Sequence, residues 1–600
     1  LMPKDAIYET SYSLRGLFEK LREDAARHGD LVDRRYGAWA RLLALFRLIH
    51  AGGGREGCRF TARKGRLFDP DAYPFLEGRA SADEEPHDLP LIPDGVVWRI
   101  LERLLVLDGE RLSYRTLDVE QIGSVYEVVM GFRAELTSGA ALALRSKSKS
   151  GAAVVVDLAA LLVLAPDKRA KALADLDVAK LTASETAGIK AARGVTALAG
   201  ALTGKVDRAA TPDLVPAGTP VLQPTDERRR SGSHYTPRAL TEPIVRETLR
   251  PILERLGPKA APEQILELKV LDPAMGSAAF LVEACRQLAE RLAQAWETHG
   301  VTPALPADED ALLHARRLIA QRCLYGVDRN PMAAELGKLS LWLATLARDH
   351  EFTFLDHCIR AGDSLVGLER GQLEALHWEP RRGRNLEIGD LLVPHTLQAI
   401  RRRRDEVREL AETLGDDDLR PRWQEIRKIG EDVRLVGDAV IAAFFAPDSG
   451  KALSAVREAV EGGNIGWQEK LRPMVDALRS GEKPVTPFHW WLEFPEAFDR
   501  DNPGFDAIVG NPPFGGHVTV VTGNMLGYTD WLRSIYPGSS GKCDVVAFFY
   551  RRAFGLLRRG GCFGLIATNT IRQGDTRGTG LRPIRAAGGT IYHAVRRLKW

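Results

Sequence analysis

Short apolar runs recur between stretches of helical periodicity through residues 231–600. The runs at 268–271, 324–328, 505–510 and 562–568 have the length and apolar content of buried strands. Buried strands that alternate with amphipathic helices form a parallel sheet covered by helices, so this half of the chain is predicted to be α/β. Ligands of such sheets bind at the carboxyl ends of the strands. The residues that follow each run are therefore the first candidates for a functional site.

The same patterns divide the chain into five segments. Apolar residues at helical spacing predict a helical N-terminal domain over residues 1–138. Residues 139–230 are rich in Ala, Lys and Pro, and we interpret them as a loosely packed helical stretch that becomes a linker. The α/β domain then occupies residues 231–368 and 489–600. Residues 369–488 interrupt it with charged helices, which we expect to form an inserted helical hairpin.

Composition limits the classes of protein that fit. A chain of 600 residues has room for several domains, and its formal net charge of +3 at pH 7 gives no global attraction to nucleic acid. Binding of nucleic acid would therefore have to depend on local basic patches. The candidates are Arg228–Arg230 and Arg401–Arg404, although a solvated helix face is the favoured interpretation of the second. Six cysteines without a Cys-x-x-Cys pair, and the lack of a secretory signal or a long apolar stretch, predict a cytoplasmic protein without disulfides, zinc or a membrane span.

The most informative motif follows the run at 505–510 and reads Asn511-Pro512-Pro513-Phe514. Two prolines end the sheet ladder and hold Asn511 at the carboxyl edge of its strand. The side-chain carbonyl of Asn511 and the main-chain carbonyl of Pro512 offer two acceptors, which suit an exocyclic amino group with two hydrogens. The ring of Phe514 can lie against the flat base that carries this amine. For the isolated motif, an Asx-type turn that closes a strand is an equally good interpretation.

Three further positions carry candidate ligand-binding groups. The run at 268–271 leads into Asp272 and a turn of small residues before a helix, where free N–H groups suit an anion such as a carboxylate. The run at 324–328 ends in Asp328, which suits ribose hydroxyls. Asp363 follows a further short segment and suits an adenine amino group. Each has a structural alternative, because small residues often serve helix packing and an aspartate often caps a helix.

Together these elements resemble the amino-group DNA methyltransferases of the γ arrangement. In that group, a half that binds S-adenosyl-L-methionine (AdoMet) precedes the Asn-Pro-Pro-aromatic motif. A further AdoMet motif comes before both, and it is visible as Gly232-Ser233-His234-Tyr235-Thr236-Pro237. Within that group, the chain most resembles the Eco57I-like adenine methylases of type IIG restriction systems and of BREX- and DISARM-type phage defence. It covers roughly residues 90–135 and most of 231–600, and its typical segments are 117–127, 489–498 and 568–577.

The resemblance implies a Rossmann-like methyltransferase domain that transfers a methyl group from AdoMet to N6 of an adenine flipped out of double-stranded DNA. It implies that the transfer needs no metal ion. It also implies that other subunits of a restriction or defence system can be partners of the chain. A target-recognition domain is expected after Trp600. The residues that it assigns to catalysis are Asn511, Pro512, Pro513 and Phe514. The residues that it assigns to the cofactor are Tyr235, Thr236, Pro237, Asp272, Pro273, Ala274, Gly276, Ala279, Phe280, Asp328, Arg329, Asp363, Ser364 and Asn511.

The loop after Asp272 departs from the family pattern at two positions. The family usually has Asp-Pro-Ala-Cys-Gly-Ser-Gly, whereas Met275 and Ala278 stand here in place of the Cys and the last Gly. A methyl group at Ala278 is expected to narrow the approach to the cofactor.

Three other functions compete with this one. Type IIG enzymes fuse a nuclease to the methylase, and the clearest Glu-x-Lys motif is Glu267-Leu268-Lys269, although a strand edge is its favoured interpretation. The Asn-Pro-Pro-aromatic motif also serves the methylation of RNA guanine and protein glutamine. A non-catalytic scaffold that binds DNA or a partner is compatible with Ala278. Binding of AdoMet and the identity of the methylated product separate these alternatives.

Overall fold

A computed structural model describes most of the chain. The described residues are 6, 8–55, 58–64, 66–82, 84, 88–107, 109–111, 131–147, 152–176, 178–224, 236–305, 310–345, 354–379, 387–410, 414, 416–462, 466–481, 483–516, 520–521 and 523–596. The segment 117–127, the run Arg228–Arg230 and the motif residues Gly232–Tyr235 lie outside them. Contacts divide the chain into two compact units, which are Ser124–His234 and the combination of Leu1–Gly123 with Tyr235–Trp600.

The N-terminal segment is mainly helical. Its long helices are α1 (Leu14–Val32), α2 (Ala38–Ala51) and α3 (Asp94–Leu105), and a short hairpin of β1 (Gly53–Arg55) and β2 (Cys58–Phe60) follows α2. Leu17 of α1 and Val97 of α3 are buried in one hydrophobic cluster. This packing follows from apolar residues that recur on one face of each helix.

The unit Ser124–His234 combines antiparallel strands with helices and is not the loosely packed helical stretch and linker expected from its composition. Its described strands pair in two antiparallel ladders, β5 (Phe132–Leu136) with β8 (Pro220–Pro224) and β6 (Ala141–Leu144) with β7 (Val154–Asp157). Its described α-helices are α5 (Leu158–Val163), α6 (Pro166–Asp175), α7 (Ala183–Ala191) and α8 (Val195–Leu202). Leu144, Val156, Leu173 and Leu198 share a buried core. These larger apolar residues are sparse among the alanines, but together they are enough to close a core.

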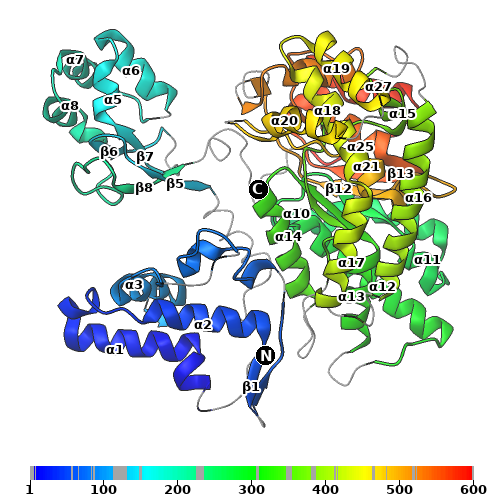
Figure 1. Ribbon diagram of the computed structural model, residues 1–600, viewed down its shortest axis with the longest axis horizontal. Helices are drawn as coiled ribbons and strands as arrows, with labels where there is room; N and C mark the ends of the chain where they lie inside the picture. Colours follow the sequence, from blue (N-terminus) through cyan, green and yellow to red (C-terminus); the bar gives the residue numbers. More distant parts are fainter. Residues whose placement is uncertain are drawn as a thin grey trace. The chain divides into compact units, whose positions relative to one another are not determined.

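Five parallel strands form the sheet of the C-terminal half in its described part (Figure 1). They are β9 (Val270–Asp272), β10 (Leu324–Asp328), β11 (Ile359–Ala361), β12 (Phe505–Gly510) and β13 (Leu557–Leu565). Their order across the sheet is β11-β10-β9-β12-β13, which is 3-2-1-4-5 in chain order, and each neighbouring pair is parallel. The predicted α/β fold with a parallel sheet is confirmed. The strand order reverses between β9 and β12, and sheets of this kind bind ligands at such a switch point.

Helices and aromatic residues cover the two faces of this sheet. Three helices pack side by side over one face, namely α10 (Arg238–Leu256), α12 (Ala279–His299) and α14 (Pro331–Ala344), and α25 (Val546–Leu556) connects β12 to β13. A Cβ on Gly326 of β10 would lie 2.9 Å from Leu281 of α12. The neighbouring Tyr325 therefore points to the opposite face. There it packs edge-on against Phe494, with ring centroids 5.0 Å apart.

The insertion between β11 and β12 adds a layer of helices to the sheet domain. The described part of residues 369–488 contains no strand, and its helices are α15 (Arg370–Glu374), α16 (Glu387–Leu410), α17 (Asp416–Ile429), α18 (Glu431–Phe445), α19 (Ser449–Glu461) and α20 (Trp467–Arg479). Six helices thus stand where a hairpin was expected. Leu365 and Val366, which follow β11, share one hydrophobic core with Val440 of α18 and with Trp491. Because this core joins the insertion to the strand ends, the two fold as one body.

Candidate active site at the carboxyl edge of the sheet

Four polar residues lie at the carboxyl edge of the sheet, each on a different strand end. Asp272 and Asp328 are the last residues of β9 and β10. Asn511 directly follows β12, and Asp363 follows β11 after one glycine. The strands are parallel neighbours, so these four ends belong to the same edge. The structure therefore brings together the strand-end residues that the sequence motifs supplied.

Asn511 keeps its side-chain carbonyl oxygen free. Its Nδ2 donates to Thr236 Oγ1 over 3.2 Å, and Thr236 is buried. Thr236 and the half-buried Pro237 directly precede α10, whereas Tyr235 lies outside the described residues. Asn511 Oδ1 is buried without a hydrogen-bond partner among the described residues. A buried acceptor without a partner costs about 1–3 kcal/mol, so this oxygen suits a donor that a ligand brings.

Asp272 is a second buried acceptor with a free oxygen. Its Oδ1 accepts the Ala274 N–H over 3.0 Å, whereas its Oδ2 is buried without a hydrogen-bond partner among the described residues. Burial raises the pKa of this carboxyl to about 8; the Ala274 N–H opposes the rise and the Asp328 carboxylate adds to it. A Cβ on Gly510 would lie 2.6 Å from Asp272 Oδ1, so only a glycine there allows this approach. A cationic ligand beside Asp272 would lower the pKa again.

Asp328 shapes the loop between β9 and α12. Its Oδ2 accepts the Gly276 N–H over 2.9 Å, and its Oδ1 accepts the Asn330 N–H over 2.8 Å. The Met275 N–H donates to the Val327 carbonyl over 3.1 Å, which ties the same loop to β10. Asp328 thus anchors the turn and the start of α14, and a contact with ribose stays a prediction.

The two departures from the family loop pack into the core. Ala278 has φ 64° and ψ 27°, the left-handed conformation that glycine adopts without strain. Its side chain is fully buried. A Cβ on Gly337 of α14 would lie 3.3 Å from Met275 Sδ and 3.4 Å from the Ala278 Cβ. The methyl group of Ala278 therefore lies against α14, and its effect on the approach to the cofactor stays a prediction.

Other residues predicted to contact the cofactor divide into buried and accessible ones. Phe280 and Ala279 begin α12 with 2% and 8% exposed area, so the Phe280 ring is part of the core. Ala274 is half-buried. The Pro273 carbonyl accepts a hydrogen bond from Ser364 Oγ over 2.5 Å. That bond joins the loop after β9 to the loop after β11.

Asp363 is engaged by Tyr528, which the sequence motifs did not include, and by Arg329, which they did. Tyr528 Oη lies 3.1 Å and 3.0 Å from the two carboxylate oxygens of Asp363 and donates to them. Arg329 Nε is 3.9 Å from Asp363 Oδ2, and the same guanidinium donates to Asn524 Oδ1. Tyr528 begins α24 (Tyr528–Ile535) and is 165 positions from Asp363 along the chain. No local sequence pattern could have indicated this pair.

The remainder of the Asn-Pro-Pro-Phe motif forms the turn after β12. Pro512 is buried, whereas Pro513 and Phe514 are half-buried. The following residue, Gly515, donates its N–H to Asp544 Oδ1 over 3.0 Å, and Asp544 lies just before α25. The Phe514 ring therefore lies on a turn that is held on one side by β12 and on the other by Asp544.

The arginine run on α16 consists of ion-paired side chains. Arg401 pairs with Asp499 at 2.9 Å, Arg402 with Glu406 at 3.9 Å, Arg403 with Glu425 at 3.7 Å and Arg404 with Glu496 at 2.6 Å. Arg404 is only 7% exposed and cannot reach a DNA phosphate without breaking its pair. These contacts favour the helix-face interpretation of the run over a DNA-binding patch.

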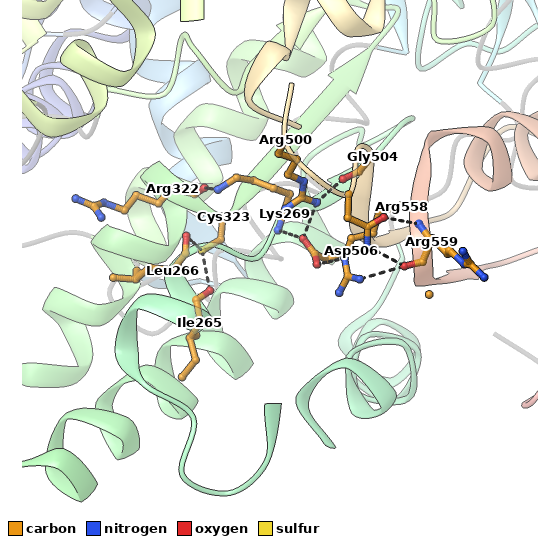
Figure 2. Close-up of polar contacts among 12 residues, drawn as sticks. Ile265, Leu266, Lys269, Arg322, Cys323, Arg500, Gly504, Asp506, Arg558 and Arg559 are labelled. Atoms are coloured by element: carbon orange, nitrogen blue, oxygen red, sulfur yellow. Dashed lines mark hydrogen bonds and ion pairs between the residues drawn. The ribbon is translucent and has the colours of Figure 1, made fainter. Parts of the chain in front are cut away.

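The Glu-x-Lys motif at Glu267–Lys269 has a structural role at the opposite edge of the sheet. Lys269 is buried, its Nζ donates to the Arg322 carbonyl over 2.9 Å, and its N–H donates to Asp506 Oδ2 over 2.9 Å (Figure 2). Arg500 and Arg558 pair with the same carboxylate. In the part of the chain that the structure describes, no group of three or more His, Cys, Asp or Glu side chains could hold a metal ion. In that part there is also no helix with the length and apolar character to cross a membrane.

Known proteins match the chain over the strands that carry this site. Residues 322–587 match the Eco57I restriction-modification methylase, and residues 258–362 match the DNA-methyltransferase domain of MmeI. A putative type II restriction enzyme and methyltransferase of Methanocaldococcus jannaschii is 23% identical over 423 residues, which are 58% of this chain and 32% of that protein. The chain thus spans about a third of the length of this curated relative.

One solved structure, of the type IIL restriction-modification enzyme MmeI in complex with DNA, matches with 15% identity and a TM-score of 0.29. It covers 61% of this chain and 34% of MmeI, and at this TM-score it carries no information on how the chain is arranged. The two family matches together include Asp272, Asp328, Asp363 and Asn511. These matches over residues 258–587 support an Eco57I-like DNA methyltransferase.

Proposed function

We propose that this chain transfers a methyl group from AdoMet to N6 of an adenine in double-stranded DNA, as the modification component of a restriction-modification or phage-defence system. The proposal depends above all on two buried oxygens without hydrogen-bond partners among the described residues, Asn511 Oδ1 and Asp272 Oδ2, which come from adjacent strands. The first suits an amino group of a base, and the second suits a cationic methyl donor. The matches to the two methyltransferase families support the methyl-transfer chemistry.

The proposed AdoMet pocket lies over the loop from Asp272 to Phe280 in a Rossmann-like domain. The strand order 3-2-1-4-5 supports this fold, because it is the order of dinucleotide-binding sheets. Main-chain N–H groups at the start of α12 suit the AdoMet carboxylate. Asp328 would accept the ribose hydroxyls. Asp363 would accept the adenine amino group while it shares its carboxylate with Tyr528.

The target adenine has to leave the duplex, because its amino group is otherwise paired. Asn511 Oδ1 and the Pro512 carbonyl would accept the two amino hydrogens and so align the nitrogen lone pair with the methyl group that AdoMet supplies when bound. Thr236 would keep the Asn511 amide in this orientation. Stacking of Phe514 on the base would contribute about 1–3 kcal/mol. The neutral amine needs no general base before transfer.

The domain limits follow the same proposal. Residues 231–368 and 489–600 would form the methyltransferase domain, with residues 369–488 as its insertion. The helical N-terminal segment ends before the limit expected at residue 138, because β5 belongs to the unit Ser124–His234. Double-stranded DNA is the proposed partner, and no metal takes part in the transfer. The chain spans about a third of its curated relative, so sequence recognition and any cleavage are tested on the full-length protein.

Transfer of labelled methyl groups from AdoMet to duplex DNA tests this function. The full-length protein should produce N6-methyladenine, identified by mass spectrometry of the digested DNA. Methylated cytosine, RNA or protein would assign the site to another amine. If calorimetric titration detects no binding of AdoMet, the result would favour the alternative of a non-catalytic scaffold.

A further inference from the structure

The loop from Asp363 to Leu368, which follows β11, is held by side chains from later parts of the chain. Three indole N–H groups donate to its main-chain carbonyls: Trp490 to Ser364 over 3.2 Å, Trp531 to Leu365 over 3.1 Å and Trp491 to Leu368 over 2.9 Å. The loop also carries Asp363 and Ser364, which are candidates for the cofactor pocket. The position of these two residues therefore depends on donors that lie outside the pocket.

His489 accepts a hydrogen bond from the same loop. The Leu368 N–H donates to His489 Nδ1 over 3.1 Å, and His489 Nε2 lies 3.1 Å from Asp438 Oδ1. Because Nδ1 acts as an acceptor, the ring proton is on Nε2, which donates it to Asp438. His489 and Asp438 are each 1% exposed, so water does not replace either bond.

Asp438 connects this histidine to the helical insertion. It lies on α18 and pairs with Arg479 of α20. A Cβ on the neighbouring Gly437 would lie 2.6 Å from His489 Cε1 and 2.7 Å from His489 Nε2. Only a glycine lets the imidazole ring lie directly against α18. A continuous series of contacts thus runs from α18 through His489 to the Leu368 N–H.

A second tie between the insertion and the sheet lies in the same segment. Glu493 pairs with Arg360 of β11 and with Arg434 of α18, each at 2.7 Å. Burial acts to raise the pKa of Glu493, but the two guanidinium groups outweigh it and hold the pKa well below its ordinary value. Residues 489–498, a segment typical of this family branch, therefore join the insertion to β11 and to the loop that follows it.

We propose that His489 is a positioning residue, through which the helical insertion holds the loop Asp363–Leu368 in its cofactor-binding conformation. Asp438 fixes the orientation and tautomer of His489, and His489 in turn fixes the Leu368 N–H. This inference rests on the proposed function, because it assigns Asp363 and Ser364 to the AdoMet pocket. It gives residues 369–488 a role in cofactor binding although they lie outside the proposed pocket.

Two substitutions at His489 separate its two hydrogen bonds. His489→Asn keeps an acceptor at the position of Nδ1 and loses the contact with Asp438. His489→Gln keeps a donor near Nε2 and loses the acceptor for Leu368. Gly437→Ala perturbs the same ring from the insertion side. Glu496→Gln is the control, because it weakens a buried pair with Arg404 that does not touch the loop.

Two properties of the full-length protein are measured for each variant. The free energy of unfolding is measured as well, so that an effect on the loop can be separated from a general loss of stability. The first is amide hydrogen exchange over residues 363–368 without AdoMet, followed by mass spectrometry. The second is calorimetric titration with AdoMet. We expect roughly tenfold faster exchange and roughly tenfold weaker AdoMet binding in His489→Gln and Gly437→Ala. We expect a smaller effect of the same kind in His489→Asn, because it loses the contact with Asp438 through which α18 acts, and values close to those of the parent in the Glu496→Gln control.

Unchanged exchange in both His489→Gln and Gly437→Ala would overturn the proposal. Effects that follow the loss of stability equally in all four variants would also overturn it, since His489 would then be an ordinary core residue. If the parent does not bind AdoMet, the proposed function fails, and the exchange measurement alone decides whether His489 supports the loop.

Discussion

Asn511 Nδ2 donates a hydrogen bond to Thr236 Oγ1 although the two residues are 275 positions apart along the chain. The bond joins the motif before α10 to the motif after β12. It leaves the Asn511 Oδ1 as the amide atom without a partner among the described residues. Thr236, in the motif before α10, thus orients Asn511, which we propose to act on the target amine.

Removal of the Thr236 hydroxyl should slow methyl transfer. Thr236→Val keeps the shape of the side chain but leaves Asn511 Nδ2 without its acceptor, so the amide can rotate and present a donor to the target amine. We expect a roughly tenfold lower kcat from steady-state transfer to duplex DNA, the effect of losing one orienting hydrogen bond of about 1.4 kcal/mol. Thr236→Ser keeps the hydroxyl and should retain the parent rate. Equal rates in the parent and Thr236→Val would show that this bond does not orient Asn511.

Removal of the Asp328 carboxylate should weaken AdoMet binding without unfolding the protein. Asp328→Ala leaves the Gly276 and Asn330 N–H groups without their acceptor and removes the proposed ribose contact. We expect a loss of about 1–3 kcal/mol in calorimetric titration. Asp310→Ala is a matched control, because Asp310 accepts the Leu313 N–H as the cap of α13 (Ala311–Arg322). Unchanged affinity in Asp328→Ala, or an equal loss in the control, would contradict the placement of the pocket.

Asp272 should make the stability of the cofactor-free protein depend on pH. Its folded-state pKa is about 8 against an ordinary value of 3.8, so the folded state holds a proton that the unfolded chain releases. The contribution of this group to stability is full below about pH 4 and is lost as pH rises to about 8. Asp272→Asn removes this dependence. In urea titrations the variant should be more stable than the parent at pH 8, by up to a few kcal/mol, and should show no such gain at pH 4. A gain of equal size at both pH values would show that ionisation of the buried carboxyl is not its cause.

Removal of the Phe514 ring should weaken capture of the flipped base. Phe514→Ala eliminates the stacking surface. We expect kcat/KM for duplex DNA to fall, by a factor that corresponds to a rise of about 1–3 kcal/mol in ΔG‡. Phe514→Tyr keeps a ring and should retain most of the parent value. AdoMet affinity should be the same in all three proteins. If Phe514→Ala transfers methyl groups as the parent does, the base is held by other residues.

The strand ends of the site could be predicted because they depend on local pattern. Asp272, Asp328 and Asn511 each end or follow a short apolar run, and parallel strands place their carboxyl ends on one edge. The pairing of Asp363 with Tyr528 and of His489 with Asp438 could not be predicted in this way. Those contacts join segments that are distant in sequence, and only tertiary packing brings them together.

The directions in which side chains point could also not be predicted from the sequence. Phe280 and Ala278 lie in a motif that predicts cofactor contact, but the turn before α12 directs both side chains into the core. The small unit Ser124–His234 was missed for a related reason. Its core uses a few leucines and valines spread among alanines, which leave no clear periodicity.

The most direct test of the proposed active site compares the parent with Asn511→Ala in two assays on the full-length protein. Calorimetric titration should give AdoMet affinities within about twofold of each other, because Asn511 Oδ1 is proposed to accept from the target amine and the other residues assigned to the cofactor lie elsewhere in the chain. Transfer of labelled methyl groups to duplex DNA should produce N6-methyladenine with the parent. With Asn511→Ala it should fall by a factor of about 1,000 or more, because the target amine is no longer aligned. Undiminished transfer by Asn511→Ala would contradict the assignment of the active site.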